Sequence, residues 1–497
     1  MQSPARSRFL KPLPFVALAL VTVISLVGAS FARAAATDKS LSTNFTLVNL
    51  ATAGSAVVTI NYYTDTGAAW AVSAANQSVT LTNPGDQVII RQYTDSTMPA
   101  GRGSAVASSS APLGAVVQIQ ARNQVPTLGA YTGSSAPATK YYVPTVLRKI
   151  ANISSSQIMI QNATSSAITA DVAFTKASAS GGSNFTKTGI AIAANSTYYY
   201  DIETETNLAD GWFGSAVVTS ASQIVVMSNL FTKPDTVQAF NAFTDAQLSS
   251  LWFVPLFVSR LSNGLLTPVS VQNLSGGTLA AGEIAITCTP DAASPTQGTI
   301  TYSNSASVAV NETFSMNPNT DRTNLPTDWY GSCKVSTGAK NVAVFVQMRR
   351  PGVSQDAAAY EALNGNGTAT KFLVPLVGKR LGSGFATVTT IQNLSASQSA
   401  SVTLTYTPSS EYVAGGGSSA VLTKGPFTIP AGGSLLRNLR LPYNASSAVT
   451  EDLPDGWYGS LKVTSSGPAI DGFVQLTLLS NPQNGDTLQA HGVFPLP

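Results

Sequence analysis

The sequence predicts an all-β protein in which four tandem β-sandwich modules follow a signal peptide. Three observations lead to this prediction. Runs of alternating apolar and polar residues, such as 57–62 and 402–406, are rich in β-branched and aromatic side chains. Turn-forming residues recur about every 8–12 residues, the spacing of strands in a β-sandwich. Several short phrases also recur three or four times along the chain, which is typical of a repeat protein.

The composition argues against several functional classes. Of the 497 residues, 44% are hydrophobic and 10% are charged, so the chain has enough apolar material for buried cores. Its 27 basic and 24 acidic residues give a net charge of only +3 and are scattered, which argues against a nucleic-acid surface. One histidine and two cysteines leave little for a metal site or for histidine-based catalysis. We therefore expect no cofactor, no metal and no enzymatic activity.

Residues 1–34 have the pattern of a secretory signal peptide. Three basic residues within the first eleven positions precede an apolar core at 15–31, and Ala32-Arg33-Ala34 fits a cleavage site. A retained membrane anchor is the alternative, although the apolar stretch is at the short end for a bilayer span of roughly 20 residues. No later stretch is long and apolar enough to span a membrane. We therefore expect a mature chain that is secreted, either extracellular or associated with the cell surface.

A Val-Pro phrase marks each of the later copies of the repeated pattern. An asparagine of a Gln-Asn pair lies 18 positions after each proline, and a basic residue lies five positions after it. The phrases are Tyr142-Val143-Pro144, Phe253-Val254-Pro255 and Leu373-Val374-Pro375. The asparagines are Asn162, Asn273 and Asn393, and the basic residues are Lys149, Arg260 and Arg380. Identical spacing in three copies indicates one structural unit repeated in tandem.

A Gly-Trp phrase follows later in each copy. It has the form Trp-aromatic-Gly-Ser, preceded by Gly or Asp, and contains Trp212, Trp329 and Trp457. The first copy is degenerate, because Gly101-Arg102-Gly103-Ser104 lacks the tryptophan. These tryptophans are candidates either for core plugs or for sugar-stacking platforms. A tryptophan at the mouth of a buried strand favours the core plug.

An apolar run and an Ala-aromatic pair end each copy. The apolar runs cover residues 116–119, 224–227, 342–345 and 473–476. The pairs are Ala130-Tyr131, Ala239-Phe240, Ala359-Tyr360 and Ala490-His491. The single histidine thus stands where the other copies carry tyrosine or phenylalanine. We interpret His491 as a packing residue and not as a catalytic one.

The sequence allows two positions for the Val-Pro strand within a module. In the favoured arrangement it closes the preceding module, and the chain divides into a signal peptide (1–34) and modules 35–147, 148–258, 259–378 and 379–497. In the other arrangement it opens each module, and the first module lacks it. The C-terminal residues Phe494, Pro495 and Leu496 resemble this strand and are a candidate donor or closing strand. Head-to-tail donation of that strand between chains would build a filament.

Both cysteines fall in the third module. Cys333 directly follows the Gly-Ser of the Gly-Trp phrase. Cys288 ends a strand whose counterparts end at Tyr62, Thr175 and Tyr406, if a two-residue insertion is allowed. We predict a cross-strand disulfide between them, as an exported protein permits, with two reduced core cysteines as the alternative. The bridge would stabilise the fold by roughly 3–4 kcal/mol on the chain-entropy model.

Other motifs carry little chemistry. Acidic residues recur at matched positions only before the Gly-Trp phrase, where we interpret them as turn formers: Asp210, Asp328 and Asp455. No calcium loop and no phosphate-binding glycine loop is found. The repeated asparagines lie in Asn-x-Ser/Thr sequons, and the same side chains are equally suited to capping a turn.

Together these phrases resemble those of tandem β-sandwich repeat proteins of bacterial cell surfaces, with modules near the ~100 residues of an immunoglobulin-like domain. The resemblance is one of architecture and covers the mature chain. Such families form surface layers, sheaths, stalks or adhesive fibres. The resemblance implies a structural protein of the cell surface or extracellular matrix, and the C-terminal strand offers it a means of head-to-tail self-assembly. The alternative is an adhesin or glycan-binding array acting as a monomer. Expected partners are the protein itself, other surface proteins or glycans, and not nucleic acid or a membrane.

Overall fold

The computed structural model describes residues 41–121, 126–234, 236–351, 356–442, 451–479 and 486–496. The predicted signal peptide, residues 1–34, lies outside this part. The strands of the described residues form seven sheets and pair antiparallel, which confirms the predicted all-β class. No helix among these residues is long and apolar enough to cross a membrane.

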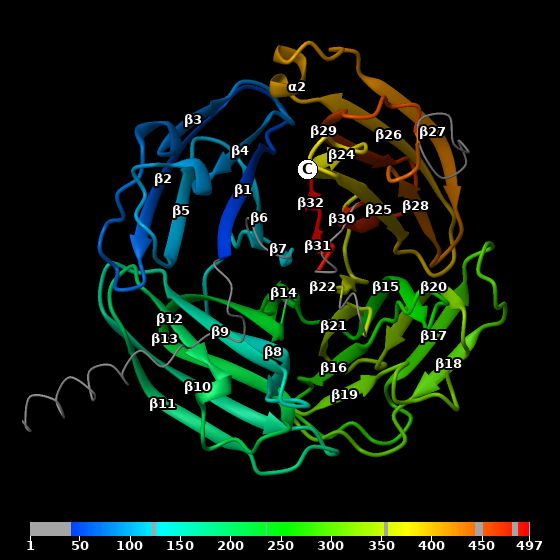
Figure 1. The fold of residues 1–497 in the computed structure, drawn as a ribbon. Helices are drawn as coiled ribbons and strands as arrows, with labels where there is room; N and C mark the ends of the chain where they lie inside the picture. The colour runs from blue at the N-terminus through cyan, green and yellow to red at the C-terminus, as the bar shows by residue number, and fades with distance from the viewer. Residues whose placement is uncertain are drawn as a thin grey trace, which may run out of the picture. The chain divides into compact units, whose positions relative to one another are not determined.

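The strands are labelled in Figure 1 and follow the sequence repeats. The first repeat contains β1 (Leu41–Asn49), β2 (Ala56–Thr64), β3 (Ser78–Leu81), β4 (Gln87–Arg91), β5 (Gly103–Ser109), β6 (Leu113–Ala121) and β7 (Leu128–Thr132). The second contains β8 (Ala138–Arg148), β9 (Ser154–Asn162), β10 (Ile168–Lys176), β11 (Phe185–Ile192), β12 (Thr197–Asp201), β13 (Trp212–Thr232) and β14 (Thr236–Asn241).

The third repeat contains β15 (Leu251–Ser259), β16 (Val269–Asn273), β17 (Ala285–Pro290), β18 (Ile300–Ser303), β19 (Thr313–Met316), β20 (Trp329–Ser336), β21 (Val342–Arg349), β22 (Ala357–Glu361) and β23 (Leu363–Asn364). The fourth contains β24 (Lys371–Gly378), β25 (Phe385–Asn393), β26 (Ala400–Pro408), α2 (Ser410–Ala414), β27 (Leu422–Ile429), β28 (Ser434–Asn438), β29 (Tyr458–Ser465), β30 (Ile470–Leu478), β31 (Leu488–Gly492) and β32 (Phe494–Pro495). Short 3-10 turns are Ala74–Asn76, Gln92–Thr94, Ile202–Thr204 and Asp245–Gln247.

Each repeat builds a closing sheet, which ends in the strand with the Ala-aromatic pair, and an opening sheet, which carries the Gly-Trp strand. The closing sheets have the orders β4-β1-β6-β7, β12-β9-β13-β14, β19-β16-β21-β22 and β28-β25-β30-β31. The opening sheets have the orders β3-β2-β5, β11-β10-β13-β8, β18-β17-β20-β15 and β27-β26-β29-β24. In the second repeat the long strand β13 joins both, so they count as one seven-stranded sheet. In the other opening sheets the Gly-Trp strand (β13, β20 or β29) pairs with a Val-Pro strand (β8, β15 or β24). Its counterpart in the first repeat, β5, has no such neighbour among the described residues.

Burial explains why these segments form strands. In β2 the residues alternate between buried and exposed from Ala56 to Tyr62, which is the two-residue period of a strand with one covered face. β21 is instead buried from Val342 to Met348. Both of its faces are covered, and Phe345 packs on Phe240 of the second repeat with ring centroids 4.1 Å apart. Continuous apolar runs therefore mark the strands that lie between repeats.

The Val-Pro strand belongs to the repeat that follows it. β8 pairs with β13, so that Arg148 lies opposite Trp212, and β15 and β24 pair in the same way with β20 and β29. The arrangement favoured from the sequence, in which this strand closes the preceding module, is therefore wrong. Boundaries at 147, 258 and 378 separate each opening strand from its sheet. The register of β15 shifts between Val254 and Phe257, because Pro255 has no N–H to donate to the ladder.

The C-terminal residues complete their own repeat. Phe494 of β32 lies opposite Leu373 of the Val-Pro strand β24. Phe243 and Leu363 pair in the same way with the Val-Pro strands of the second and third repeats. By their pairing, residues 494–496 are the counterpart of the short segment that follows each Ala-aromatic pair. In this structure they pair within their own repeat, as a closing strand does.

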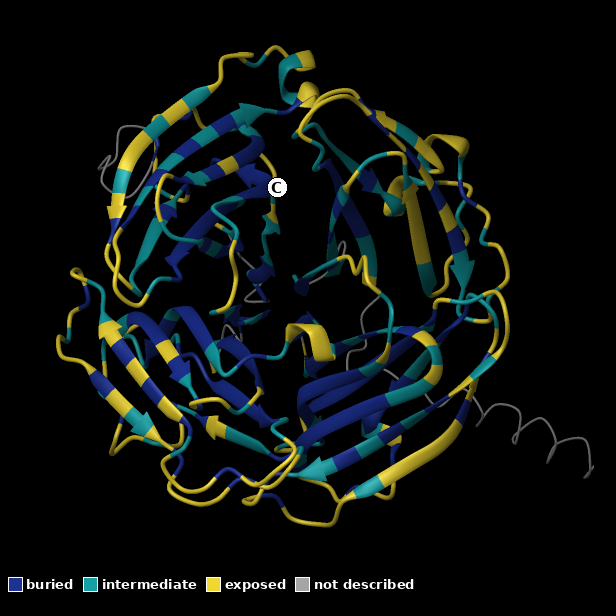
Figure 2. Cartoon of the chain, turned by 180° about the vertical axis from the view of Figure 1, so that it is seen from behind, coloured by how far each residue is buried: buried dark blue, intermediate teal, exposed yellow. Residues whose placement is uncertain are grey.

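The four closing strands contact one another in cyclic order, β7 with β14, β14 with β22, β22 with β31 and β31 with β7. Figure 1 shows them meeting in the middle of the unit formed by residues 36–497, and Figure 2 shows buried residues concentrated there. Asn241 links two junctions, since its Nδ2 donates to Thr132 O at 2.9 Å and its backbone N–H donates to Glu361 at 2.7 Å. Tyr360 stacks on Phe473 with centroids 4.1 Å apart. The aromatic residues of the pairs therefore hold neighbouring repeats together.

Candidate functional site at the first repeat

The three predicted tryptophans are buried. Trp212 and Trp329 have no exposed surface, and Trp457 is 3% exposed. The Nε1 atoms of Trp212 and Trp329 donate to Ser183 O and Gly298 O, at 3.1 and 2.9 Å. Each ring meets a core aromatic residue, for example Trp457 against Tyr406 in an edge-on contact. None of these rings offers a free face to a sugar, so the site candidates must be sought elsewhere.

The predicted disulfide is present. Cys288 of β17 and Cys333 of β20 lie directly opposite each other in the opening sheet of the third repeat and are bonded. Both side chains are buried, at 0% and 2% exposure. The bridge therefore replaces an apolar cross-strand contact of the sandwich core.

The recurring asparagine is a structural staple. Asn273 is fully buried, and its Nδ2 donates to Gly277 O, Val308 O and Ala309 O at 2.8, 2.9 and 3.1 Å. Its Oδ1 accepts from the N–H of Ser275 at 3.1 Å. The same pattern of contacts is made by Asn49, Asn162 and Asn393. The turn-capping alternative from the sequence thus describes how this side chain is used.

His491 packs among the closing strands. It is 2% exposed, and its Nδ1 lies 2.7 Å from Gly492 O, to which the neutral ring donates. It pairs with Val474 across β30 and β31. This placement agrees with the interpretation of His491 as a packing residue.

Replacing His491 with phenylalanine, the residue at the equivalent position of the second repeat, is expected to reduce the loss of unfolding free energy between pH 6.5 and pH 4. Burial lowers the pKa of His491 from 6.5 to about 4. Between these pH values the unfolded chain binds more protons than the folded chain. The stability due to the neutral ring is therefore complete above pH 6.5 and falls by about 3 kcal/mol toward pH 4. Urea unfolding at pH 7 and pH 4.5 measures this difference. Equal pH dependence in both proteins would contradict it.

The first repeat departs from the other three at the end of its sandwich. Arg102 takes the place of the tryptophan and is exposed. Trp70, from a loop after β2, fills that end instead, with its ring against Gly101, where a Cβ would lie only 3.1 Å from it. Trp70 is only partly buried, and its Nε1 donates to Pro99 O at 3.2 Å. This repeat alone therefore presents an accessible indole at the end corresponding to the buried tryptophans.

An open cleft of about 690 Å³ surrounds this indole. Its lining residues are Thr64, Asp65, Thr66, Ala68, Trp70 and residues 99–102. Arg102 Nε donates to Asp65 Oδ2 at 2.9 Å, and the guanidinium lies over the Tyr199 ring at 4.6 Å. An aromatic face beside a carboxylate, a guanidinium and two hydroxyls is suited to binding a polar ring such as a sugar.

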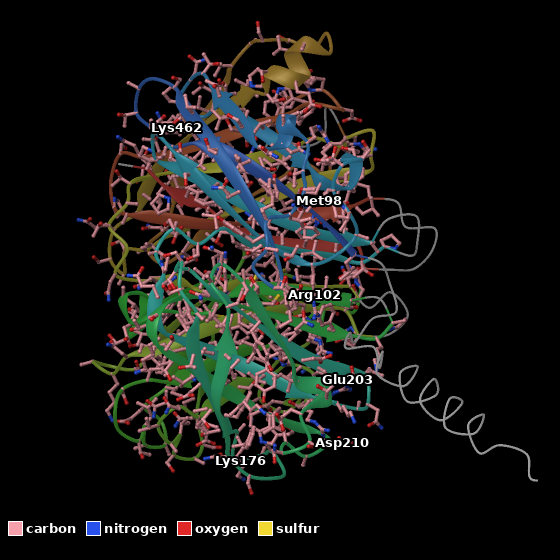
Figure 3. The ribbon with its side chains drawn as sticks, turned by 90° about the vertical axis from the view of Figure 1, so that its left-hand side faces the viewer. Met98, Arg102, Lys176, Glu203, Asp210 and Lys462 are labelled. Carbon is pink, nitrogen blue, oxygen red and sulfur yellow. A yellow bond between two sulfur atoms is a disulfide. The ribbon has the colours of Figure 1, made fainter. Side chains whose placement is uncertain are left out.

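The cleft adjoins the open edge of β5. Tyr199, from β12 of the second repeat, donates its hydroxyl to Gly103 O at 2.8 Å. Burial raises the pKa of Tyr199 to about 12, against the opposing effect of Arg102, so this hydroxyl stays protonated at neutral pH. Figure 3 shows Arg102 where the strands of the first repeat meet those of the second. Tyr199 thus fixes the first residue of β5 and leaves the rest of its edge uncovered.

The junction between the first and second repeats also lacks, among the described residues, a serine hydrogen bond that two other junctions make. The serine hydroxyl of the Gly-Trp phrase donates to a turn of the next repeat in the second and third repeats, from Ser215 to Asn311 O and from Ser332 to Gly432 O. The counterpart Ser104 has a buried hydroxyl without a partner among the described residues. Sequence reasoning missed this site. Its one signal was the degenerate phrase at 101–104.

Comparisons with known proteins add no functional information. No protein-family model matches the chain, and no curated protein matches it. Among solved structures, the chain is similar to Escherichia coli alpha-2-macroglobulin activated by porcine elastase, at 12% identity over 92% of this chain. This chain spans 43% of that protein, and the TM-score of 0.08 carries no argument about fold or function.

Proposed function

We propose that the protein is a non-enzymatic, exported structural protein of the cell surface or extracellular matrix, in which four repeats act as one rigid scaffold. The observation that carries this proposal is the cyclic contact of the closing strands. Each repeat buries apolar surface against two neighbours there, which favours a fixed arrangement of the repeats over independently moving domains. Repeat units that follow the strand pairing are residues 36–137, 138–250, 251–370 and 371–497.

Export is supported by the N-terminal pattern and by the buried disulfide. Disulfides form and persist in oxidising compartments such as the extracellular space. The low charge of the chain, 10% of its residues, favours close contact with other surface components over colloidal solubility. Because Phe494 pairs within its own repeat, head-to-tail donation of the C-terminal strand is not part of this proposal.

The alternative function, an adhesin or glycan binder acting as a monomer, is favoured by the Trp70 cleft. It is supported by the partly exposed indole and by the Asp65–Arg102 pair beside it. It differs from the scaffold proposal in requiring saturable binding by a single dispersed chain. The two functions therefore predict different results for one set of measurements.

Fractionation of the host into medium, surface wash and envelope tests the scaffold. We expect most of the full chain in the surface fraction, and a deletion strain is expected to lose surface material seen by electron microscopy of thin sections. Recovery of the chain inside the cell would refute the proposal.

A glycan array with the purified chain tests the alternative. The scaffold predicts no saturable signal. Saturable binding that is lost in Trp70→Ala and kept in Tyr93→Ala would establish the glycan binder instead. Tyr93 is a suitable control because it is an aromatic residue of the same repeat with 40% exposure.

A further inference from the structure

The edge of β5 is a strand position that the other repeats fill. In those repeats the counterpart strands β13, β20 and β29 each pair with a Val-Pro strand. β5 pairs with β2 on one side and, among the described residues, with no strand on the other. The same chain therefore contains three occupied examples of the site that is open here.

Backbone groups of the odd-numbered residues of β5 face the open edge. The N–H of Ser110 donates to Val57 O of β2, and Arg102 O accepts from Asp65 on the same side. Because strand residues alternate, the N–H and C=O groups of Ala105 and Ala107 point the other way. Gly103 O confirms this direction, since it accepts from Tyr199 outside the sheet. At Ala105 and Ala107 an added strand would find N–H and C=O groups that pair with no strand of the described residues.

The core-facing side chains of β5 are exposed, whereas those of the equivalent strands β13, β20 and β29 are buried. Ala105 and Ala107 lie on the core-facing side, opposite Tyr62 and Ile60. Both alanines are exposed. Their counterparts are all buried, at 0–2% exposure: Ala216, Val218, Cys333, Val335, Leu461 and Val463. The exposure of Ala105 and Ala107 follows from the missing strand.

The described parts of this chain have no strand left to donate. β8, β15 and β24 are paired within their own repeats, and so is Phe494. The sequence before β1 also lacks the Val-Pro phrase that marks an opening strand. Counting 18 back from Asn49 places Ala29-Ser30-Phe31 at the Val-Pro position, and Ala36 where the basic residue recurs. Among the described residues, no strand of this chain is therefore available for the edge of β5.

Charges define the chemistry of this occupant. In the second and fourth repeats the basic residue after the Val-Pro strand pairs with an acid before the Gly-Trp phrase, Lys149 with Asp210 at 3.5 Å and Arg380 with Asp455 at 3.1 Å. The first repeat has Ala100 at the position of that acid. Arg102 stands close by with its side chain half-exposed. Because Arg102 is itself paired with Asp65 at 2.9 Å, no unpaired acid among the described residues stands here to receive a basic residue, so the site favours a segment without one.

We propose that β5 accepts an extended, apolar strand without basic residues from a partner protein, by β-augmentation. The inference rests on the proposed function, because it gives the scaffold a means of attachment to other surface proteins. The new strand would extend the sheet β3-β2-β5 and cover Ala105 and Ala107.

The probe is a fluorescent peptide with the sequence of Leu251–Ser259, which carries no charge and forms the opening strand of the third repeat. Fluorescence anisotropy with the full chain, as its host exports it, is expected to give a dissociation constant on the order of micromolar. Ala107→Glu is expected to weaken binding at least tenfold, because the carboxylate would lie against the apolar face of the added strand. Val57→Glu is the matched control and is expected to bind as the natural chain does, because Val57 is 49% exposed on β2, away from the edge.

Four results would overturn the proposal. They are no binding of the peptide, equal binding by Ala107→Glu, binding only after proteolytic removal of residues before β1, and a dimer of the chain alone that Ala107→Glu abolishes. The third would make the chain's own N-terminal segment the occupant, and the fourth would make it a second copy. The proposed function stands or falls separately, because surface fractionation does not depend on peptide binding.

Discussion

Replacing Glu451 with alanine is expected to lower the free energy of unfolding by about 3–5 kcal/mol. Glu451 and Arg437 form an ion pair in the core of the fourth repeat, and each side chain is 1% exposed. Arg437 Nε donates to Glu451 Oε1 at 2.6 Å, and the Tyr406 hydroxyl donates to the same oxygen at 3.1 Å. Removing the carboxylate takes the negative charge of Glu451 away from a buried guanidinium. Equilibrium unfolding in urea measures the loss.

The matched control is the neighbouring acid. Asp452 pairs with Lys424 at 3.0 Å, but its side chain is 51% exposed. Because water screens exposed ion pairs, Asp452→Ala is expected to change the free energy of unfolding by less than about 1 kcal/mol. A similar loss in both variants would show that the environment of Glu451 is not the buried one described here.

The second large effect is expected at the asparagine staple. Asn273→Asp keeps the shape and the Oδ1 acceptor but replaces the Nδ2 donor by an oxygen facing three carbonyl groups. We expect a loss of about 4 kcal/mol, because several buried acceptors lose their partner and a carboxylate is buried beside them. Thermal and urea unfolding measure this loss, and the disulfide can be kept intact throughout.

Asn263→Asp is the control for this change. Asn263 is exposed, and its Oδ1 accepts from the N–H of Leu265 at 3.0 Å, a contact that an aspartate keeps. The free energy of unfolding of the Asn263→Asp variant is expected to stay within about 0.5 kcal/mol of that of the natural chain. If Asn273→Asp were equally mild, the staple would not stabilise the loops that it joins.

Local patterns were sufficient for much of the fold. The two-residue period of residues 57–62 predicts β2, and the repeated phrases predict which strands are equivalent. Comparing copies also placed Cys288 opposite Cys333, because equivalent strands keep the same register. The candidate site was not predictable in this way. Trp70 reaches the sandwich end from a loop that no repeated phrase marks, and only the missing tryptophan at Arg102 hinted at it.

The all-β class, the repeat and the cysteine pair could be predicted from the amino-acid sequence, because they depend on side-chain alternation and spacing along the chain. Three further features became visible only in the folded chain, because they depend on its tertiary structure. It assigned the Val-Pro strand to the following repeat, paired Phe494 with its own repeat, and left the edge of β5 open. The physical reason is that an edge strand can satisfy its backbone hydrogen bonds with any neighbour. Which neighbour it meets depends on the packing of whole sheets, and no local pattern records that.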